Sequence, residues 1–222
     1  MPDESMARTV VALSDVFESM ISPEGSKPHW FISFGTLLWF VRDRLLERPF
    51  EEDIDISMIY GAVKREDLIA KFGEYGYQLE SEVLDNYHRK PLQMVFKPVA
   101  PGLWPTNLDI YFWVIGHEFA WHTYDMFNRG VSIMDEYTFK GTPRALIEAP
   151  TLPMVWEEIA PTIQFPSKYG SLLDVWYPPN KDHLGNYIIN SCWMIQNKQY
   201  GQSKFDTMKT IKSCKDMPGD LG

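Results

Sequence analysis

The alternation of acidic and apolar residues at Asp53-Ile54-Asp55-Ile56 constrains this chain more than any other segment. Successive side chains of a β-strand point to opposite faces, so Asp53 and Asp55 project from one face and the isoleucines from the other. Carboxylates held this close repel each other unless a cation lies between them, and their hard oxygens suit Mg²⁺ or Mn²⁺. The pattern therefore predicts a strand with a metal-binding carboxylate pair. The alternative is a solvated acidic turn that leads into a half-buried strand.

The segment before these acids predicts a strand, a glycine turn and a helix. Residues 29–34 are mostly aromatic or β-branched, Gly35-Thr36 follows, and residues 37–42 are typical of a helix. Gly35 would let the backbone approach a phosphate, and Thr36 would offer a hydroxyl or N–H group at the helix N-terminus. Arg42 is a candidate for neutralising phosphate charge, with a surface salt bridge as the equal alternative.

A third candidate carboxylate, Asp109, is the only acid in the apolar run 108–113. An unpaired acid in such a strand costs several kcal/mol, roughly, unless it is hydrogen-bonded or binds a metal. An exposed strand start, or an arginine or backbone partner, would explain it equally well. Together with Asp53 and Asp55 it would complete a set able to hold one or two divalent ions around a phosphate, and it is the best-placed general base. Tyr111 alternates onto the same face as Asp109.

Four segments resemble the LicD/fukutin family of phosphotransferases, within the nucleotidyltransferase-fold superfamily. They are residues 31–42, 49–56, 108–111 and, more loosely, 165–173. The resemblance implies an α+β fold, with a nucleotidyltransferase-like mixed β-sheet flanked by helices. We expect one such domain over residues 1–222, in which 198–222 forms a surface helix or tail.

The resemblance also implies an activity. Family members move a phosphorylated alcohol, such as phosphocholine or ribitol phosphate, from a CDP-linked donor to a glycan hydroxyl and release CMP. The implied metal ligands and catalytic residues are Asp53, Asp55 and Asp109, with Mg²⁺ or Mn²⁺ as cofactor. Tyr111 is the first candidate for an aromatic wall beside a quaternary ammonium group, with an ordinary core role as the alternative. Two other functions remain open, namely transfer of the nucleotide itself to a small molecule or protein, and ligand binding without catalysis.

Composition limits the remaining possibilities. The 222 residues are 45% hydrophobic, which suffices for one domain with a sizeable core, and the net charge of −9 argues against nucleic-acid binding. Two cysteines indicate neither a disulfide framework nor a cysteine-rich zinc site. Residues 144–160, which prolines punctuate, and residues 168–176 are expected to form short helical or irregular elements. Apolar residues near helical spacing within 6–21 predict an amphipathic first helix; they are Val10, Leu13, Val16, Phe17, Met20 and Ile21. We see no signal-peptide pattern and no apolar run of the roughly 18 residues that a membrane span requires, so a cytoplasmic protein is expected.

Overall fold

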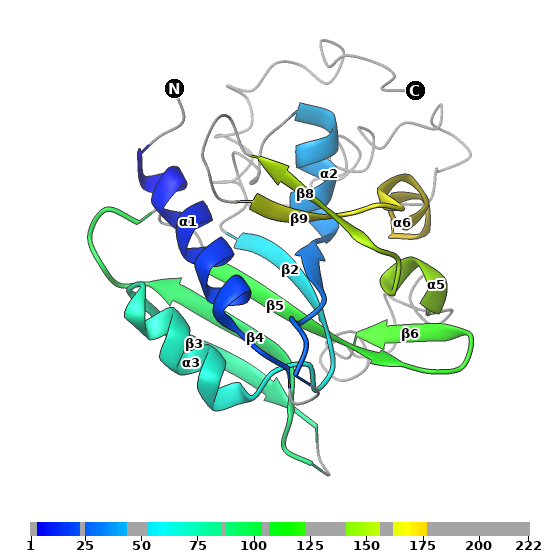
Figure 1. The fold of residues 1–222 in the computed structure, drawn as a ribbon, viewed down its shortest axis with the longest axis horizontal. Coiled ribbons are helices and arrows are strands. Elements are labelled where there is room, and N and C mark those ends of the chain that lie inside the picture. The colour runs from blue at the N-terminus through cyan, green and yellow to red at the C-terminus, as the bar shows by residue number, and fades with distance from the viewer. Residues whose placement is uncertain are drawn as a thin grey trace, which may run out of the picture.

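The computed structural model of the protein describes residues 4–22, 25–43, 53–85, 88–103, 107–122, 141–155 and 162–176. Within these ranges the chain has an α+β architecture, as the sequence predicted (Figure 1). The expected tail at 198–222 lies outside the described residues. The elements, in chain order, are α1 (Glu4–Ser19), β1 (Trp30–Ile32), α2 (Phe34–Asp43), β2 (Asp53–Ile59), α3 (Arg65–Glu74), β3 (Tyr77–Leu84), β4 (Pro91–Pro98), β5 (Asn107–Ile115), β6 (Phe119–His122), β7 (Thr142–Pro143), α5 (Arg144–Ile147), β8 (Thr151–Val155), β9 (Thr162–Pro166) and α6 (Tyr169–Trp176).

The described strands form one seven-stranded mixed sheet and one two-stranded ribbon. The central order of the large sheet is β1-β2-β5-β4-β3, and β6 pairs with both β5 and β7. Strands β2 and β5 run parallel, whereas the other pairs in this sheet are antiparallel. Parallel neighbours need a crossover connection, and here α3 and the β3–β4 hairpin supply it. Two strands far apart in the sequence thus become direct neighbours.

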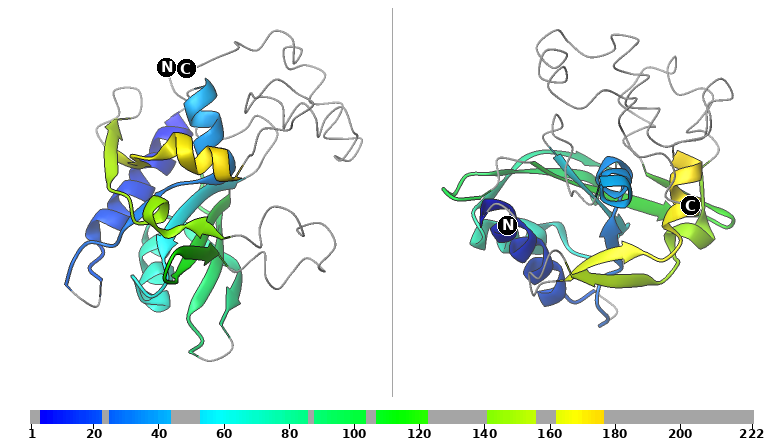
Figure 2. Two further views of the ribbon diagram at one scale, coloured as in Figure 1. Left: turned by 90° about the vertical axis from the view of Figure 1, so that its right-hand side faces the viewer. Right: turned by 90° about the horizontal axis from the view of Figure 1, so that it is seen from above.

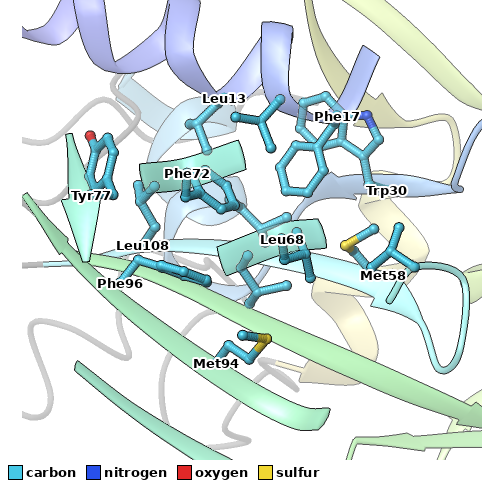
Figure 3. Close-up of a cluster of buried hydrophobic side chains, with 14 of the residues drawn as sticks. Leu13, Phe17, Trp30, Met58, Leu68, Phe72, Tyr77, Met94, Phe96 and Leu108 are labelled. Carbon is cyan, nitrogen blue, oxygen red and sulfur yellow. The ribbon is translucent and has the colours of Figure 1, made fainter. Parts of the chain in front are cut away.

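One face of the large sheet packs against α1 and α3. The predicted helical spacing of apolar residues in α1 is confirmed, because Leu13, Val16 and Phe17 all enter the core. Figure 3 shows this core between the two helices and the strands. The large sheet contributes side chains from five strands to this core, namely Trp30, Ile54, Ile56, Met58, Tyr77, Met94, Phe96, Leu108, Ile110 and Phe112. Burial of these side chains determines which face of each strand is turned inward.

The opposite face of β2 and β5 holds their polar residues and meets different elements. Helix α2 follows β1 directly and begins at Phe34, so it starts earlier than predicted and Gly35 and Thr36 lie in its first turn. Because β1 is antiparallel to β2, the start of α2 lies at the end of the sheet where β2 begins (Figure 1). Further along this face, Trp113 of β5 packs with Ile147 of α5 and Leu172 of α6.

The segment expected to contain only short helical or irregular elements instead includes a strand. Residues 151–155 form β8, which pairs with β9 in an antiparallel ribbon. This ribbon contacts β1 and α1 through β9, and it lies with α1 and α3 on the same side of the large sheet (Figure 2). In the described part of the chain, no helix is long and apolar enough to cross a membrane.

Candidate active site

The alternation at the start of β2 places the acids as predicted. Ile54 and Ile56 are fully buried in the helix-covered core, whereas Asp53 and Asp55 occupy the opposite face of the strand. Asp55 is only 6% exposed, so its carboxyl group lies inside the protein rather than in a solvated turn. A carboxyl group buried to this extent requires hydrogen-bond partners.

The parallel pairing of β2 with β5 brings the third acid beside this pair. Asp55 is directly opposite Asp109, and Asp53 is directly opposite Asn107. Neighbouring strands lie about 4.8 Å apart, so side chains at paired positions share one face and are adjacent. Asp53, Asp55 and Asp109 thus occupy one patch of the sheet, although Asp55 and Asp109 are 54 positions apart in the sequence.

The first turn of α2 binds the Asp55 carboxylate through its backbone. The N–H groups of Gly35 and Thr36 donate to Oδ2 of Asp55, at 3.0 and 3.4 Å. In return, the backbone N–H of Asp55 donates to Oγ1 of Thr36 at 2.8 Å, and the carbonyl of Asp55 accepts from the backbone N–H of Ser33 at 3.0 Å. A helix N-terminus presents unpaired N–H groups and a partial positive charge, so it stabilises a carboxylate. In this structure Gly35 and Thr36 therefore direct these N–H groups at a protein carboxylate.

Asp109 has a different environment. Gln93 Nε2 on β4 and the Tyr111 hydroxyl both donate to its Oδ2, each at 3.4 Å. Burial raises the pKa of Asp109 from 3.8 to about 7, the charge of Asp53 adds to the rise, and the two hydrogen bonds oppose it. The charge of Glu80 on β3 makes a smaller contribution to this rise in pKa. Near neutral pH the carboxyl group can therefore both accept and release a proton, as a general base requires.

Aromatic rings cluster next to Tyr111. The Phe34 ring lies 5.0 Å from that of Tyr111, 4.9 Å from that of His122 and 4.5 Å from that of Trp176. Trp113, which is 1% exposed, stacks at 6.0 Å from Phe34. Trp113 also donates from Nε1 to the Ser57 hydroxyl of β2 at 2.8 Å. Aromatic rings therefore border Tyr111, whose hydroxyl contacts Asp109.

The fit of a metal ion can be judged from the donors. Within the described ranges, no three or more His, Cys, Asp and Glu side chains converge closely enough to hold one. The Asp55 carboxylate is directed at the start of α2. The donor chemistry still suits a divalent cation, because hard carboxylate oxygens share one face and Asp53 and Asp109 repel each other there. A cation would relieve the repulsion between Asp53 and Asp109, so the donor types suit such an ion, although the three carboxylates do not converge on one point in this structure.

Arg42 lies in α2, but its side chain is outside the described residues. Sequence reasoning missed Gln93 and Phe34. Gln93 is 5% exposed and stands between the buried Leu92 and Met94. A lone amide in an apolar strand is the same signal that singled out Asp109, so it could have been found. Phe34 gave no such signal, because its backbone conformation is a property of the folded turn.

Searches of protein-family models and of curated proteins find no match for this chain.

Proposed function

We propose that the protein is a metal-dependent phosphotransferase, which moves a phosphorylated alcohol from a CDP-linked donor to a glycan hydroxyl and releases CMP. The main observation in support is the parallel β2–β5 register, which sets Asp109 beside Asp55 on the face that also holds Asp53. The sequence likeness to LicD-type enzymes supports the donor class, and a nucleotidyltransferase-like fold is part of the same proposal.

Each carboxylate has a separate task in this proposal. Asp53, Asp55 and Asp109 would hold Mg²⁺ or Mn²⁺, which would neutralise charge that develops on the diphosphate. The N-terminus of α2 binds Asp55, so this carboxylate has a fixed position in the site. Asp109 would accept the proton of the acceptor hydroxyl. The hydroxyl oxygen bonds to the alcohol-bearing phosphorus as the bond from this phosphorus to the bridging oxygen breaks, and that oxygen leaves with CMP.

Product analysis with Asp→Asn variants tests the proposal. The purified protein is incubated with Mn²⁺, a CDP-linked alcohol and oligosaccharide acceptors. CMP formation should fall at least about a hundredfold in Asp53→Asn, Asp55→Asn and Asp109→Asn, the scale of a lost general base or electrostatic contact. Asp67→Asn, on the exposed first turn of α3, is the matched control and should retain full activity.

Calorimetric titration with Mn²⁺ separates the alternatives. The wild-type protein should bind Mn²⁺, and Asp53→Asn and Asp55→Asn should abolish binding without unfolding the protein. Release of pyrophosphate from a nucleoside triphosphate would favour nucleotide transfer instead. Donor binding without turnover would favour a non-catalytic protein. Equal Mn²⁺ affinity in the wild type and both variants would rule out the metal assignment.

A further inference from the structure

The turn that binds Asp55 has an unusual backbone at Phe34. Its φ of 42° lies in the left-handed region, which L-residues with a bulky side chain rarely adopt. Within the described residues, Arg89 is the other non-glycine residue with positive φ, and it lies in the exposed β3–β4 turn. Such a conformation persists only where surrounding structure enforces it.

The aromatic contacts of Phe34 provide this enforcement. Its ring is bordered by Tyr111 and Trp113 of β5, His122 of β6 and Trp176 of α6. These partners come from three elements, and the ring lies among them in edge-on, tilted and stacked contacts, which are the favourable geometries for aromatic pairs. A ring held from several directions fixes the position of its own Cα.

The position of that Cα determines where the next two N–H groups point. Gly35 and Thr36 follow Phe34 directly, and both donate to Oδ2 of Asp55. The Asp55 side chain approaches from β2, whereas the turn follows β1, so the contact depends on the exact path of the chain through Phe34. A small rotation at this residue would redirect both donors together.

We propose that Phe34 is a positioning residue, whose anchored ring holds the α2 N-terminus so that Gly35 and Thr36 fix the Asp55 carboxylate. Its effect on activity rests on the phosphotransferase function proposed above, but its effect on the backbone does not. If Phe34 had only a structural role, its substitution would lower global stability, and the Gly35 and Thr36 amides would lose no more protection than the rest of the sheet.

Amide hydrogen exchange of the metal-free protein tests this directly. In Phe34→Leu the Gly35 and Thr36 amides should lose at least about tenfold in protection relative to the Ile56 amide, a change equivalent to about 1.4 kcal/mol. Ile56, in the fully buried part of β2, reports global opening. Phe34→Tyr keeps the ring and should restore protection. Phe165→Leu removes a buried ring that packs against Phe40, and it should lower stability without changing the relative protection of either amide.

Mn²⁺ titration and steady-state kinetics provide the second readout. Phe34→Leu should weaken Mn²⁺ binding about tenfold and lower kcat more than it raises the donor KM, whereas Phe165→Leu should change neither. Loss of amide protection together with a wild-type protein that binds no Mn²⁺ would support the positioning role and refute the proposed function. Unchanged amide protection in folded Phe34→Leu overturns the inference. If that variant does not fold, Trp176→Leu removes the ring 4.5 Å from Phe34; it should lower the protection of both amides, and unchanged protection would likewise overturn the inference.

Discussion

Asp109 should make the stability of the metal-free protein fall as the pH rises through neutrality. Burial, followed by repulsion from Asp53, raises the pKa of Asp109 from 3.8 to about 7, so the folded protein binds this proton more tightly than the unfolded chain does. Stability from such a group is fully present below the unfolded pKa and is lost as the pH rises through the folded pKa. At 1.36 kcal/mol per tenfold change, the whole shift corresponds to at most about 4 kcal/mol.

The variant Asp109→Asn isolates this contribution. Asparagine is neutral at every pH and keeps an oxygen that can accept the hydrogen bonds from Gln93 and Tyr111. Between pH 5 and pH 8 the unfolding free energy of the variant should therefore rise by about 3 kcal/mol relative to that of the wild type, because most of the Asp109 titration falls in this range. Urea denaturation in EDTA measures this difference. Asp67→Asn, on the exposed face of α3, should follow the wild type throughout.

Mn²⁺ adds a second check on the same group. At pH 8 the ion should stabilise the wild type, because it compensates the charges of Asp53 and Asp109, and it should stabilise Asp109→Asn much less. A difference in unfolding free energy between the wild type and Asp109→Asn that stays constant from pH 5 to pH 8 would refute the assigned burial and repulsion.

Two further substitutions examine the turn and the aromatic wall. Thr36→Val leaves the buried N–H of Asp55 without its acceptor at 2.8 Å, so it should lower the unfolding free energy by about 1–3 kcal/mol. Thr36→Ser keeps the hydroxyl and should not. Equal urea midpoints for the two variants would show that this hydrogen bond does not stabilise the fold. Tyr111→Leu should weaken CDP-choline binding about two- to thirtyfold in calorimetry if the ring faces the ammonium group, and Tyr111→Phe should retain it. An unchanged affinity in folded Tyr111→Leu would take Tyr111 out of the substrate site.

Local sequence patterns were sufficient to predict several elements. The spacing of Leu13, Val16 and Phe17 predicted α1. Strict alternation predicted that Asp53 and Asp55 would project from one face of β2 and Ile54 and Ile56 from the other. These predictions succeed because helix and strand periods determine which side chains share a face, whatever the rest of the chain does.

The β8–β9 ribbon shows where local signals fail. Pro153, within the proline-punctuated segment 144–160, argued against a strand there, since proline cannot donate to a sheet ladder. A two-stranded ribbon consists of edges, however, and at an edge a missing N–H costs nothing when it would face away from the partner. Pairing between segments, rather than local preference, decided this element.

The composition of the candidate site was decided jointly by sequence and tertiary structure. Asp53, Asp55, Asp109 and Tyr111 could be named from the sequence, because acids and a polar ring at alternating positions in apolar strands require partners. The sequence could not predict that these residues are adjacent, because the parallel β2–β5 register reflects the burial of apolar side chains across the whole sheet.

The orientation of the Asp55 carboxylate depends on the tertiary structure alone. The positive φ of Phe34 depends on rings from β5, β6 and α6, which converge only in the folded protein. The sequence by itself thus determined which groups face the site, since that depends only on the strand period. The tertiary structure decided how close those groups lie and which way they point, since that depends on contacts between segments distant in the chain.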